Sequence, residues 1–479
     1  MMKTIKRNFI YNASYQILII ILPIITAPYV SRVLGPSRMG QYSYSYSIAT
    51  YFLLLAKLGF DNYGNRTVAR NKSESDSLNK SFSGIYYLQI FISCISILFY
   101  VLYSFYFSKY TTLSLIQGLW VLGALLDINW LFFGLEEFSI VVLRNTIVKV
   151  ISVILIFVFV REQGDLWKYA LILSAGSVIG FAVTWPFIFK RIKFVRVTYK
   201  EIFSHFKQTL VLFIPVIAIS VFTVLDKIML GYLSSFAQVG YFEAAEKVMM
   251  APKGIIGALG TVMLPRMASL YSEKDNKNKT LFINISIGIA LIFSIGCMFG
   301  IIGISKSFVP IFFGDKYLPT IAILSVMSIV LPFYAIGNVV RTQMLIPNMR
   351  DRPYVISVIA GAVINVILNY TLIPKLGANG SVIATLIAEI VIAVVQLLAV
   401  VSELRVKIFF PVLLNSFISS ILMIVIMKFI PLFVNNNFID LVLQIILGLL
   451  VFLVTFIILS KNSKNEILVL VLKNLKLHK

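Results

Sequence analysis

The chain has 479 residues; 59% are hydrophobic, only 13% are charged, and the mean hydropathy is +0.93. Soluble domains are about half apolar and about a quarter charged, so this composition excludes an ordinary soluble protein. The charge is also unbalanced, because 42 Lys and Arg stand against 20 Asp and Glu, which gives a net charge of +22. On a soluble chain this excess would suggest nucleic acid, so its placement along the chain decides what it means.

Apolar segments long enough to cross a bilayer recur along the whole chain. A transmembrane helix needs about 20 mainly apolar residues, and runs bounded by polar residues, glycine or proline predict about fourteen such spans. They cover residues 9–34, 40–60, 82–107, 111–133, 140–160, 167–189, 206–230, 240–264, 281–304, 318–346, 354–373, 381–401, 409–430 and 438–459. No connection between them is long enough for a separate domain. We therefore predict an all-α polytopic membrane protein.

Basic residues are concentrated in alternate loops. The two tails and the loops on the same side hold about 26 Lys and Arg, whereas the loops on the other side hold about 8. Cytoplasmic loops carry such an excess in membrane proteins, so we predict that both termini are cytoplasmic. Most of the net charge then meets anionic lipid headgroups, and it gives no sign of a nucleic-acid partner.

A weak internal repeat divides the chain. The dipeptide Leu-Gly at 34–35 with Gly40 recurs about 200 residues later as Leu-Gly at 230–231 with Gly240. Internal repeats are common in secondary transporters. We predict four parts: a six-helix bundle over 1–190, a basic cytoplasmic linker over 191–205, a second six-helix bundle over 206–402, and two extra helices with a basic cytoplasmic tail over 403–479.

Three segments and a pair of asparagines resemble a known family. They are Asn-Trp-Leu-Phe-Phe-Gly-Leu-Glu at 129–136, Val-Gly-Tyr-Phe-Glu-Ala-Ala-Glu-Lys at 239–247, Met-Leu-Pro-Arg-Met at 263–267, and Asn365 and Asn369 followed by Ile-Pro at 373–374 and Gly-Ala-Asn-Gly at 377–380. In order and spacing they resemble the polysaccharide repeat-unit flippases of the Wzx type, for O-antigen, capsule or exopolysaccharide. That family belongs to the multidrug/oligosaccharidyl-lipid/polysaccharide exporter superfamily.

The resemblance implies a fold, a substrate and a location. The fold would be MATE-like, with two six-helix bundles around a V-shaped cavity that opens alternately to each side. The substrate would be an undecaprenyl-diphosphate-linked oligosaccharide, moved from the cytoplasmic to the outer leaflet of a bacterial cytoplasmic membrane. Polysaccharide polymerase and assembly proteins would be its partners.

The eighth predicted span carries the most informative charges. Ionisable residues inside a membrane usually face a bundle interior or water, and they are functional candidates. At 100° per residue, Glu243, Glu246, Lys247, Lys253 and other polar or small residues share one face, so this face should line a cavity. A cation at mid-depth suits a diphosphate. Alternatively, Glu243 pairs with Lys247 at i and i+4, and Lys253 pairs with Glu246 or reaches the membrane surface.

Other intramembrane charges extend this hypothesis. The predicted substrate-binding residues are Lys253, Lys57, Lys149, Arg341, Glu246 and Lys247, and the predicted ion-coupling residues are Glu389 and Asp226. A membrane carboxylate can carry a proton or bind Na⁺ and thereby couple a gradient to transport. The cations could instead be anchors at the membrane surface, and Asp226 could simply neutralise Lys227.

Missing motifs narrow the functional class. No complete phosphate-binding loop occurs, because the glycines at 59 and 64 are followed by Asn65 and Arg66 rather than Lys and Ser or Thr. The two histidines, His205 and His478, form no metal-binding pattern, so we expect no metal and no cofactor. We predict a gradient-driven transporter and not an enzyme. The alternatives are a drug or metabolite exporter, a lipid II flippase, and a membrane glycan polymerase or ligase, although the short outer loops disfavour an enzyme.

Overall fold

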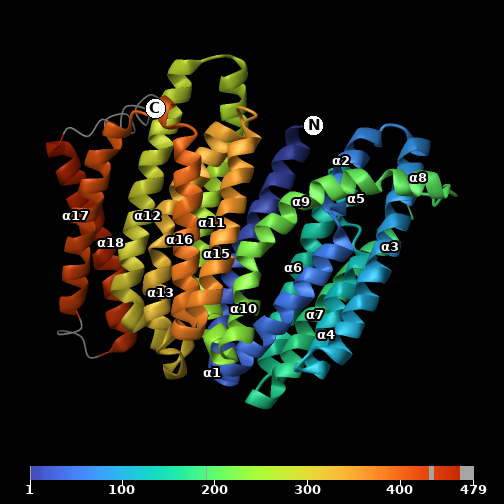
Figure 1. Ribbon diagram of the computed structural model, residues 1–479, viewed down its shortest axis with the longest axis horizontal. Coiled ribbons are helices and arrows are strands. Elements are labelled where there is room, and N and C mark those ends of the chain that lie inside the picture. The colour runs from blue at the N-terminus through green and yellow to red at the C-terminus, as the bar shows by residue number, and fades with distance from the viewer. Residues whose placement is uncertain (1, 190, 431–435, 464–479) are drawn as a thin grey trace. The chain divides into compact units, whose positions relative to one another are not determined.

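The computed structural model describes residues 2–189, 191–430 and 436–463 (Figure 1), and their side chains from residue 22 onward except those of 215, 218, 219 and 221–223. Within these residues the secondary structure is helical, with no strand. The predicted basic tail from residue 464 onward lies outside the described residues. The chain forms two compact units, Met1–Gly240 and Tyr241–Lys479. The four-part division predicted from the sequence is not tested by this partition and stays a prediction.

The first unit contains ten α-helices and two short 3₁₀ turns within its described residues. The helices are α1 Met2–Lys57, α2 Phe60–Asn71, α3 Ser75–Tyr106, α4 Thr111–Leu126, α5 Asn129–Gly134, α6 Phe138–Phe159, α7 Leu166–Thr184, α8 Tyr199–Ser204, α9 Phe206–Thr223 and α10 Leu225–Leu233; the 3₁₀ turns are η1 Gln163–Asp165 and η2 Trp185–Phe187. Helix α1 packs against α3, α4 and α6, and α4 packs against α7.

Local backbone breaks explain where the long apolar segments of the first unit bend. The predicted spans 9–34 and 40–60 form one helix, α1, interrupted at Gly35, whose φ of 74° is in the left-handed region. Glycine reaches that region without steric cost. Leu58 and Gly59 also have positive φ, and they separate α1 from the short amphipathic helix α2. The predicted span 111–133 is divided into α4 and α5 at Asp127.

A buried aromatic cluster fixes one end of the first unit. Phe60 of α2, Phe82 of α3 and Trp130 of α5 are each at most 1% exposed. The Phe82 and Trp130 rings stack with centroids 5.2 Å apart. The Trp130 Nε1 donates a hydrogen bond to Gln89 Oε1 at 2.9 Å. The chain on either side of both backbone breaks is therefore held in a packed core.

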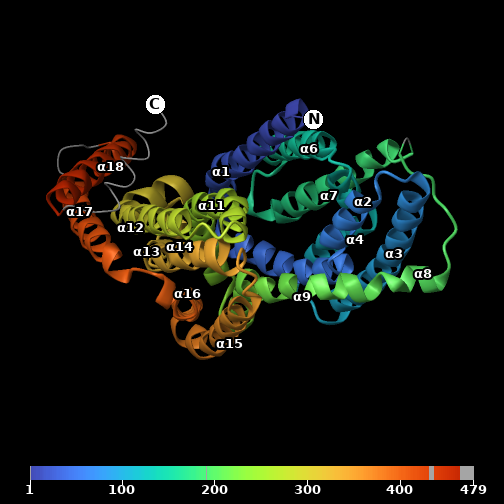
Figure 2. The same cartoon turned by 90° about the horizontal axis from the view of Figure 1, so that it is seen from above.

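The second unit begins within α11, Phe236–Ser272, which continues across the boundary at Gly240. It continues with α12 Asn276–Phe313, η3 Asp315–Tyr317, α13 Thr320–Ser328, α14 Val330–Val340, a π-helical turn η4 Arg341–Leu345, α15 Asp351–Leu376, α16 Ala378–Leu398, η5 Val401–Glu403, η6 Val406–Ile408, α17 Phe409–Phe429 and α18 Asn437–Asn462. Helix α12 packs against α13, α14, α17 and α18, and α16 packs against α15 and α14. Figure 2 shows α17 and α18 side by side.

The helices are those of a multi-pass membrane protein. Within the described residues, ten helices are long and apolar enough to cross a bilayer. The predicted count of fourteen is not confirmed. Both α17 and α18 expose a row of aliphatic and aromatic side chains, for example Phe410, Leu414, Ile446 and Leu450. A continuous apolar surface of this kind fits contact with lipid.

Candidate functional site

Three of the predicted site residues come together in the second unit. Lys253 lies on α11, Arg341 begins the π-helical turn after α14, and Glu389 lies on α16. Glu389 interacts electrostatically with both cations. The Lys253 Nζ lies 5.4 Å from the centre of the Tyr334 ring of α14. We call Lys253, Tyr334, Arg341 and Glu389 the cationic cluster.

Neighbouring polar groups position Arg341 in the cationic cluster. In the amide orientation that satisfies both of its polar atoms, the Asn338 oxygen accepts from Arg341 Nη2 at 2.9 Å, and its nitrogen donates to the Ile256 carbonyl at 3.3 Å. At Gly260 of α11, a Cβ would lie 2.5 Å from the side-chain amide of Asn338, so a larger residue there would displace this amide. The π-helical turn adds a local departure from α-helix geometry, which is frequent at functional sites.

Open space borders the α11 face next to Lys253. A Cβ placed on Gly254 would meet no atom within 4 Å, and one placed on Gly257 would meet only the Tyr334 hydroxyl, at 4.0 Å. Lys253 forms no ion pair with any described residue; its neighbours are the Tyr334 ring and, electrostatically, Glu389. The ammonium group is therefore accessible to an anion that enters this space.

Unlike Lys253, the charged residue Lys247 of α11 has an ion-pair partner on its own helix. Lys247 Nζ lies 3.6 Å from Glu243 Oε1, so these two residues form the i to i+4 pair that the sequence allowed. Glu246 lies on the same helix, two turns before Lys253. A role in substrate binding for Glu246 and Lys247 stays a prediction.

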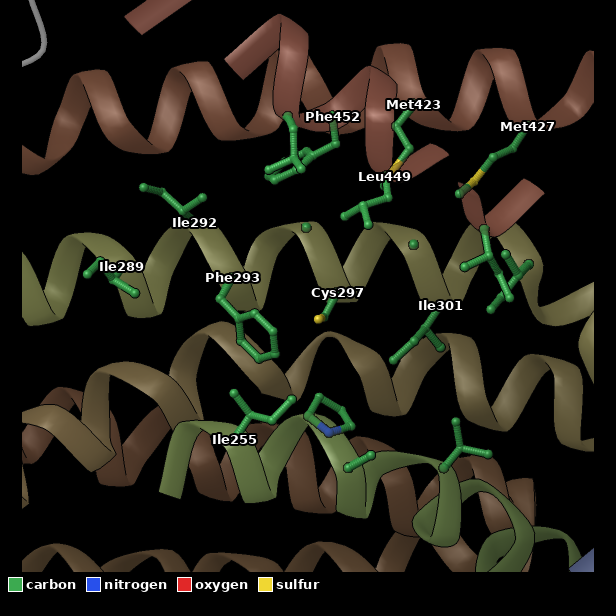
Figure 3. Close-up of a pocket in the computed structure, with 18 residues that line it drawn as sticks. Ile255, Ile289, Ile292, Phe293, Cys297, Ile301, Met423, Met427, Leu449 and Phe452 are labelled. Carbon is green, nitrogen blue, oxygen red and sulfur yellow. The ribbon is translucent and has the colours of Figure 1, made fainter. Parts of the chain in front are cut away.

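An apolar groove of about 600 Å³ lies between α11, α12, α17 and α18 (Figure 3). Phe293 and Cys297 of α12 point toward Ile255 of α11, whereas Met423 and Phe452 approach α12 from the other side. Among the residues that the structure describes, its lining contains glycine, aliphatic, aromatic and sulfur-bearing side chains but no charged residue. The groove therefore suits hydrocarbon and not a polar group.

In the first unit, the predicted site residue Lys57 is held between two carboxylates. Its Nζ lies 2.5 Å from Asp127 Oδ2 and 3.0 Å from Asp61 Oδ2. Asp127 is 2% exposed, whereas the Asp61 side chain is 52% exposed. The ion pair between Lys57 and Asp127 thus connects the end of α1 to the chain segment between α4 and α5. A role for Lys57 in substrate binding stays a prediction.

The structure places the remaining predicted residues separately. Lys149 lies partly buried on α6, and Asp226 lies on α10 with 2% exposure. Near Lys149 in sequence, Arg144 is buried, and its Nη2 donates to Asn129 Oδ1 at 3.2 Å. Neither Lys149 nor Asp226 belongs to the cationic cluster of the second unit, and their roles remain predictions.

The segment between α7 and α9, outside the membrane spans, contacts helices α2 and α3 of the same unit through polar side chains. Lys80 Nζ lies 2.5 Å from Glu201 Oε1, and this contact, with hydrogen bonds from Thr198, lowers the pKa of Glu201 to about 2. The Tyr63 hydroxyl lies 2.6 Å from His205 Nδ1. Burial lowers the pKa of His205, because a charged imidazolium is poorly solvated there.

Comparison with known proteins identifies the family. The model of the family described as "Polysaccharide biosynthesis protein" matches residues 5–271, which is more than half of the chain. The chain belongs to this family. A family relative from Shigella dysenteriae, named "Putative O-antigen transporter", is 25% identical over 397 residues, which cover 82% of this chain and 97% of the relative.

Solved structures show which fold this family member has. The lipid II flippase MurJ in an inward closed conformation matches with a TM-score of 0.77 and 20% identity, covering 95% of this chain and 99% of MurJ. An inward-facing multidrug resistance MATE family transporter of the MOP superfamily matches with a TM-score of 0.58 and 15% identity. The match covers 79% of this chain and 93% of that transporter. The fold is therefore the MurJ/MATE-like transporter fold, and the predicted fold class is confirmed. The names of these proteins are those of transporters and a flippase, in agreement with the prediction that the chain is not an enzyme.

The sequence did not predict two neutral residues in or near the cationic cluster or the acidic partner of Lys57. Tyr334 and Asn338 were not predicted because an aromatic ring and an amide in an apolar helix have ordinary packing roles. Asp127 was not predicted either, although it interrupts the apolar run 111–133. Burying a lone carboxylate in an apolar run costs free energy unless a cation lies beside it. The position of Asp127 in this run could therefore have indicated that it pairs with a cation such as Lys57.

Proposed function

We propose that this member of the polysaccharide biosynthesis protein family is a flippase for lipid-linked oligosaccharide repeat units in a bacterial cytoplasmic membrane. Its substrate is an undecaprenyl-diphosphate-linked glycan, moved from the cytoplasmic to the outer leaflet. The observation that carries the proposal is the position of Lys253 beside open space in an apolar helical unit, with Arg341 in the same cluster.

The cationic cluster has the chemistry that a diphosphate requires. A diphosphate that leaves water must exchange its hydration for charge-assisted hydrogen bonds, which ammonium and guanidinium groups donate. Within the cluster, the carboxylate of Glu389 partly neutralises both cations and limits the cost of their burial. When the diphosphate arrives, it supplies the negative charge in place of Glu389.

The apolar groove complements the cationic cluster. Its two sides come from α11 and α12 and from α17 and α18. Lys253 and the groove residue Ile255 are two positions apart on α11, so the charged and the apolar surfaces share a helix. In the proposed function, the cluster holds the diphosphate, and the groove receives part of the polyprenyl chain.

Glu389 and Asp226 are the proposed coupling residues. Transport by alternating access would use a proton or Na⁺ gradient, and both termini would be cytoplasmic, as the distribution of basic residues predicts. Imposing each gradient separately on vesicles would identify the ion. A Glu389→Gln variant should lose the response to the gradient, with Asp226→Asn as the second variant; a full response in both would exclude these carboxylates from coupling.

Depletion of the protein in its host cell tests the proposed function. The lipid-linked repeat unit should accumulate on the cytoplasmic face and the surface polymer should decrease. If the repeat unit still appears on the outer face at the normal rate, the proposal is wrong. Two parallel measurements separate the alternatives: arrest of peptidoglycan synthesis would indicate a lipid II flippase, and increased drug sensitivity would indicate an exporter.

A further inference from the structure

A second pocket lies in the first unit, far from the cluster of Lys57 and Asp127. Its volume is about 430 Å³, within the range of about 300–1,000 Å³ that is usual for small-molecule sites. Arg38 of this pocket and Lys57 are 19 residues apart on one continuous stretch of α1, or about 28 Å along the axis. This distance is close to the bilayer core thickness, so the pocket lies at the end of the unit that the basic residues predict to be extracytoplasmic.

A chain of hydrogen bonds organises the polar wall of this pocket. Arg38 Nη1 donates to Gln41 Oε1 at 3.1 Å, and Gln41 Nε2 donates to the Tyr110 hydroxyl at 3.1 Å. Gln41 is only 8% exposed, so its amide is fixed in the wall, whereas Arg38 is exposed. Arg38 forms no ion pair with a described residue, and its positive charge is available to a ligand.

The loop before α7 and the first turn of this helix add an aromatic side chain to the lining of the pocket. Trp167, in the first turn of α7, lines the pocket and is 48% exposed. The loop before it is held by Asp165, which accepts hydrogen bonds from the backbone N–H groups of Arg161 at 2.8 Å and Glu162 at 3.2 Å. Lys168 Nζ lies 2.6 Å from Asp165 Oδ1, so its charge is already compensated.

The donor set of the pocket identifies a class of ligand. Thr111 and Thr112 add two hydroxyl groups beside the amide and the phenol, and Trp167 adds a flat apolar surface. Hydroxyl-rich ligands with an apolar face, such as sugar rings, need this combination of an aromatic side chain and several neutral hydrogen-bonding groups. Arg38 is the one cation among the described residues of the lining, and its guanidinium group can bind a carboxylate in bidentate geometry.

We propose that this pocket binds an acidic sugar unit of the glycan on the extracytoplasmic side. This inference rests on the proposed function, which makes a lipid-linked glycan the substrate. A phospholipid headgroup is the other anionic molecule available at this depth, but its phosphate would engage Arg38 and make no use of the hydroxyl groups and the indole. The pocket would retain the glycan after transfer and favour repeat units that contain a uronic acid.

Fluorine NMR of the full chain in lipid nanodiscs tests the proposal. The sequence has four tryptophans, so incorporation of 5-fluorotryptophan gives four signals, and Trp167→Phe assigns the signal of Trp167. Titration with glucuronate should shift this signal saturably, at concentrations several-fold lower than glucose requires. Arg38→Gln should raise the half-saturating concentration about ten-fold. Arg32→Gln, another exposed arginine of α1, is the matched control and should change nothing.

The outcomes separate this proposal from the proposed function. Absence of a saturable shift with glucuronate overturns the sugar site, and so does a stronger shift with glycerol 3-phosphate, which would identify a lipid headgroup site. Unchanged positions of the other three signals in Arg38→Gln show that this variant is folded. Transfer of repeat units is measured separately in vesicles. If transfer occurs but glucuronate causes no shift, only the proposed sugar site is wrong. If glucuronate causes the shift but no transfer occurs, only the proposed flippase function is wrong.

Discussion

Lys253 directs its ammonium group at the ring of Tyr334, with 5.4 Å between Nζ and the ring centre. Cation–π contacts of this kind stabilise a charge that lacks an ion-pair partner by about 0.5–2 kcal/mol. Because open space borders the adjacent Gly254, the cation is held in place and is still accessible. This relationship makes Lys253 the residue whose removal should affect substrate transfer most.

Replacing Lys253 with Gln should lower the rate of repeat-unit transfer about ten-fold or more, because a charge-assisted hydrogen bond to the diphosphate is lost. Lys253→Arg should keep most of the activity, since it retains the charge. The measurement is transfer into the outer leaflet per molecule of protein. Lys316→Gln, at an exposed position, is the matched control. Full transfer by Lys253→Gln would remove this residue from the site.

Filling the apolar groove should slow transfer without unfolding the protein. A Cβ at Gly300 would lie 3.9 Å from Met423 Cε, so Gly300→Leu projects a side chain into free volume. The neighbouring variant Ile302→Leu lies outside the groove lining, conserves volume and should be silent. Transfer rate and melting temperature are measured for both variants. Normal transfer by a folded Gly300→Leu protein would contradict a role of the groove in binding the lipid chain.

The buried ion pair of the first unit should be important for stability. Asp127→Asn removes the carboxylate that lies 2.5 Å from Lys57; loss of one partner of a fully buried pair costs about 3–5 kcal/mol, and the cost here should be smaller because Lys57 keeps its contact with Asp61. Asp61→Asn should cost much less, because the Asp61 side chain is half exposed. The double variant Lys57→Met/Asp127→Leu should recover most of the loss in melting temperature. Equal effects of the two single variants would show that burial does not control this pair.

The pKa of His205 predicts an acid-sensitive contact outside the membrane spans. Burial lowers the folded-state pKa of His205 below the ordinary value of about 6.5. As the pH falls through about 6.5, the unfolded chain therefore binds a proton at this residue before the folded protein does. The stability contributed by neutral His205 is therefore complete above pH 6.5 and decreases as the pH falls below it. Between pH 7.5 and 5.5 the melting temperature should decrease less for His205→Gln than for the unmodified protein. His478→Gln, which changes the only other histidine, is the control; an identical decrease in all three proteins would contradict the assignment.

Periodicity and charge predicted the fold class because a bilayer imposes strong and simple constraints. Apolar length predicts helices, and mid-helix charges such as Lys253 and Glu389 are too costly to be random. That Lys253, Arg341 and Glu389 come from three helices of one unit depends on tertiary packing, which single-sequence periodicity does not contain.

Backbone breaks were harder to predict than helices. The sequence indicated a turn between residues 34 and 40, yet the helix resumes directly after Gly35, because one residue with positive φ is enough to redirect it. The pairing of Lys57 with Asp127 was not predicted either. It depends on breaks in two segments that are about 70 residues apart and meet only in the folded unit.

Transfer of a lipid-linked oligosaccharide across reconstituted vesicles tests the central claim most directly. The purified protein is placed in liposomes with an undecaprenyl-diphosphate-linked repeat unit on one leaflet, and a glycan-cleaving enzyme added to the other side detects what has crossed. We predict transfer well above that of protein-free liposomes, reduced about ten-fold or more by Lys253→Gln and unchanged by Lys316→Gln. Transfer by the folded protein at the rate of protein-free liposomes would contradict the account.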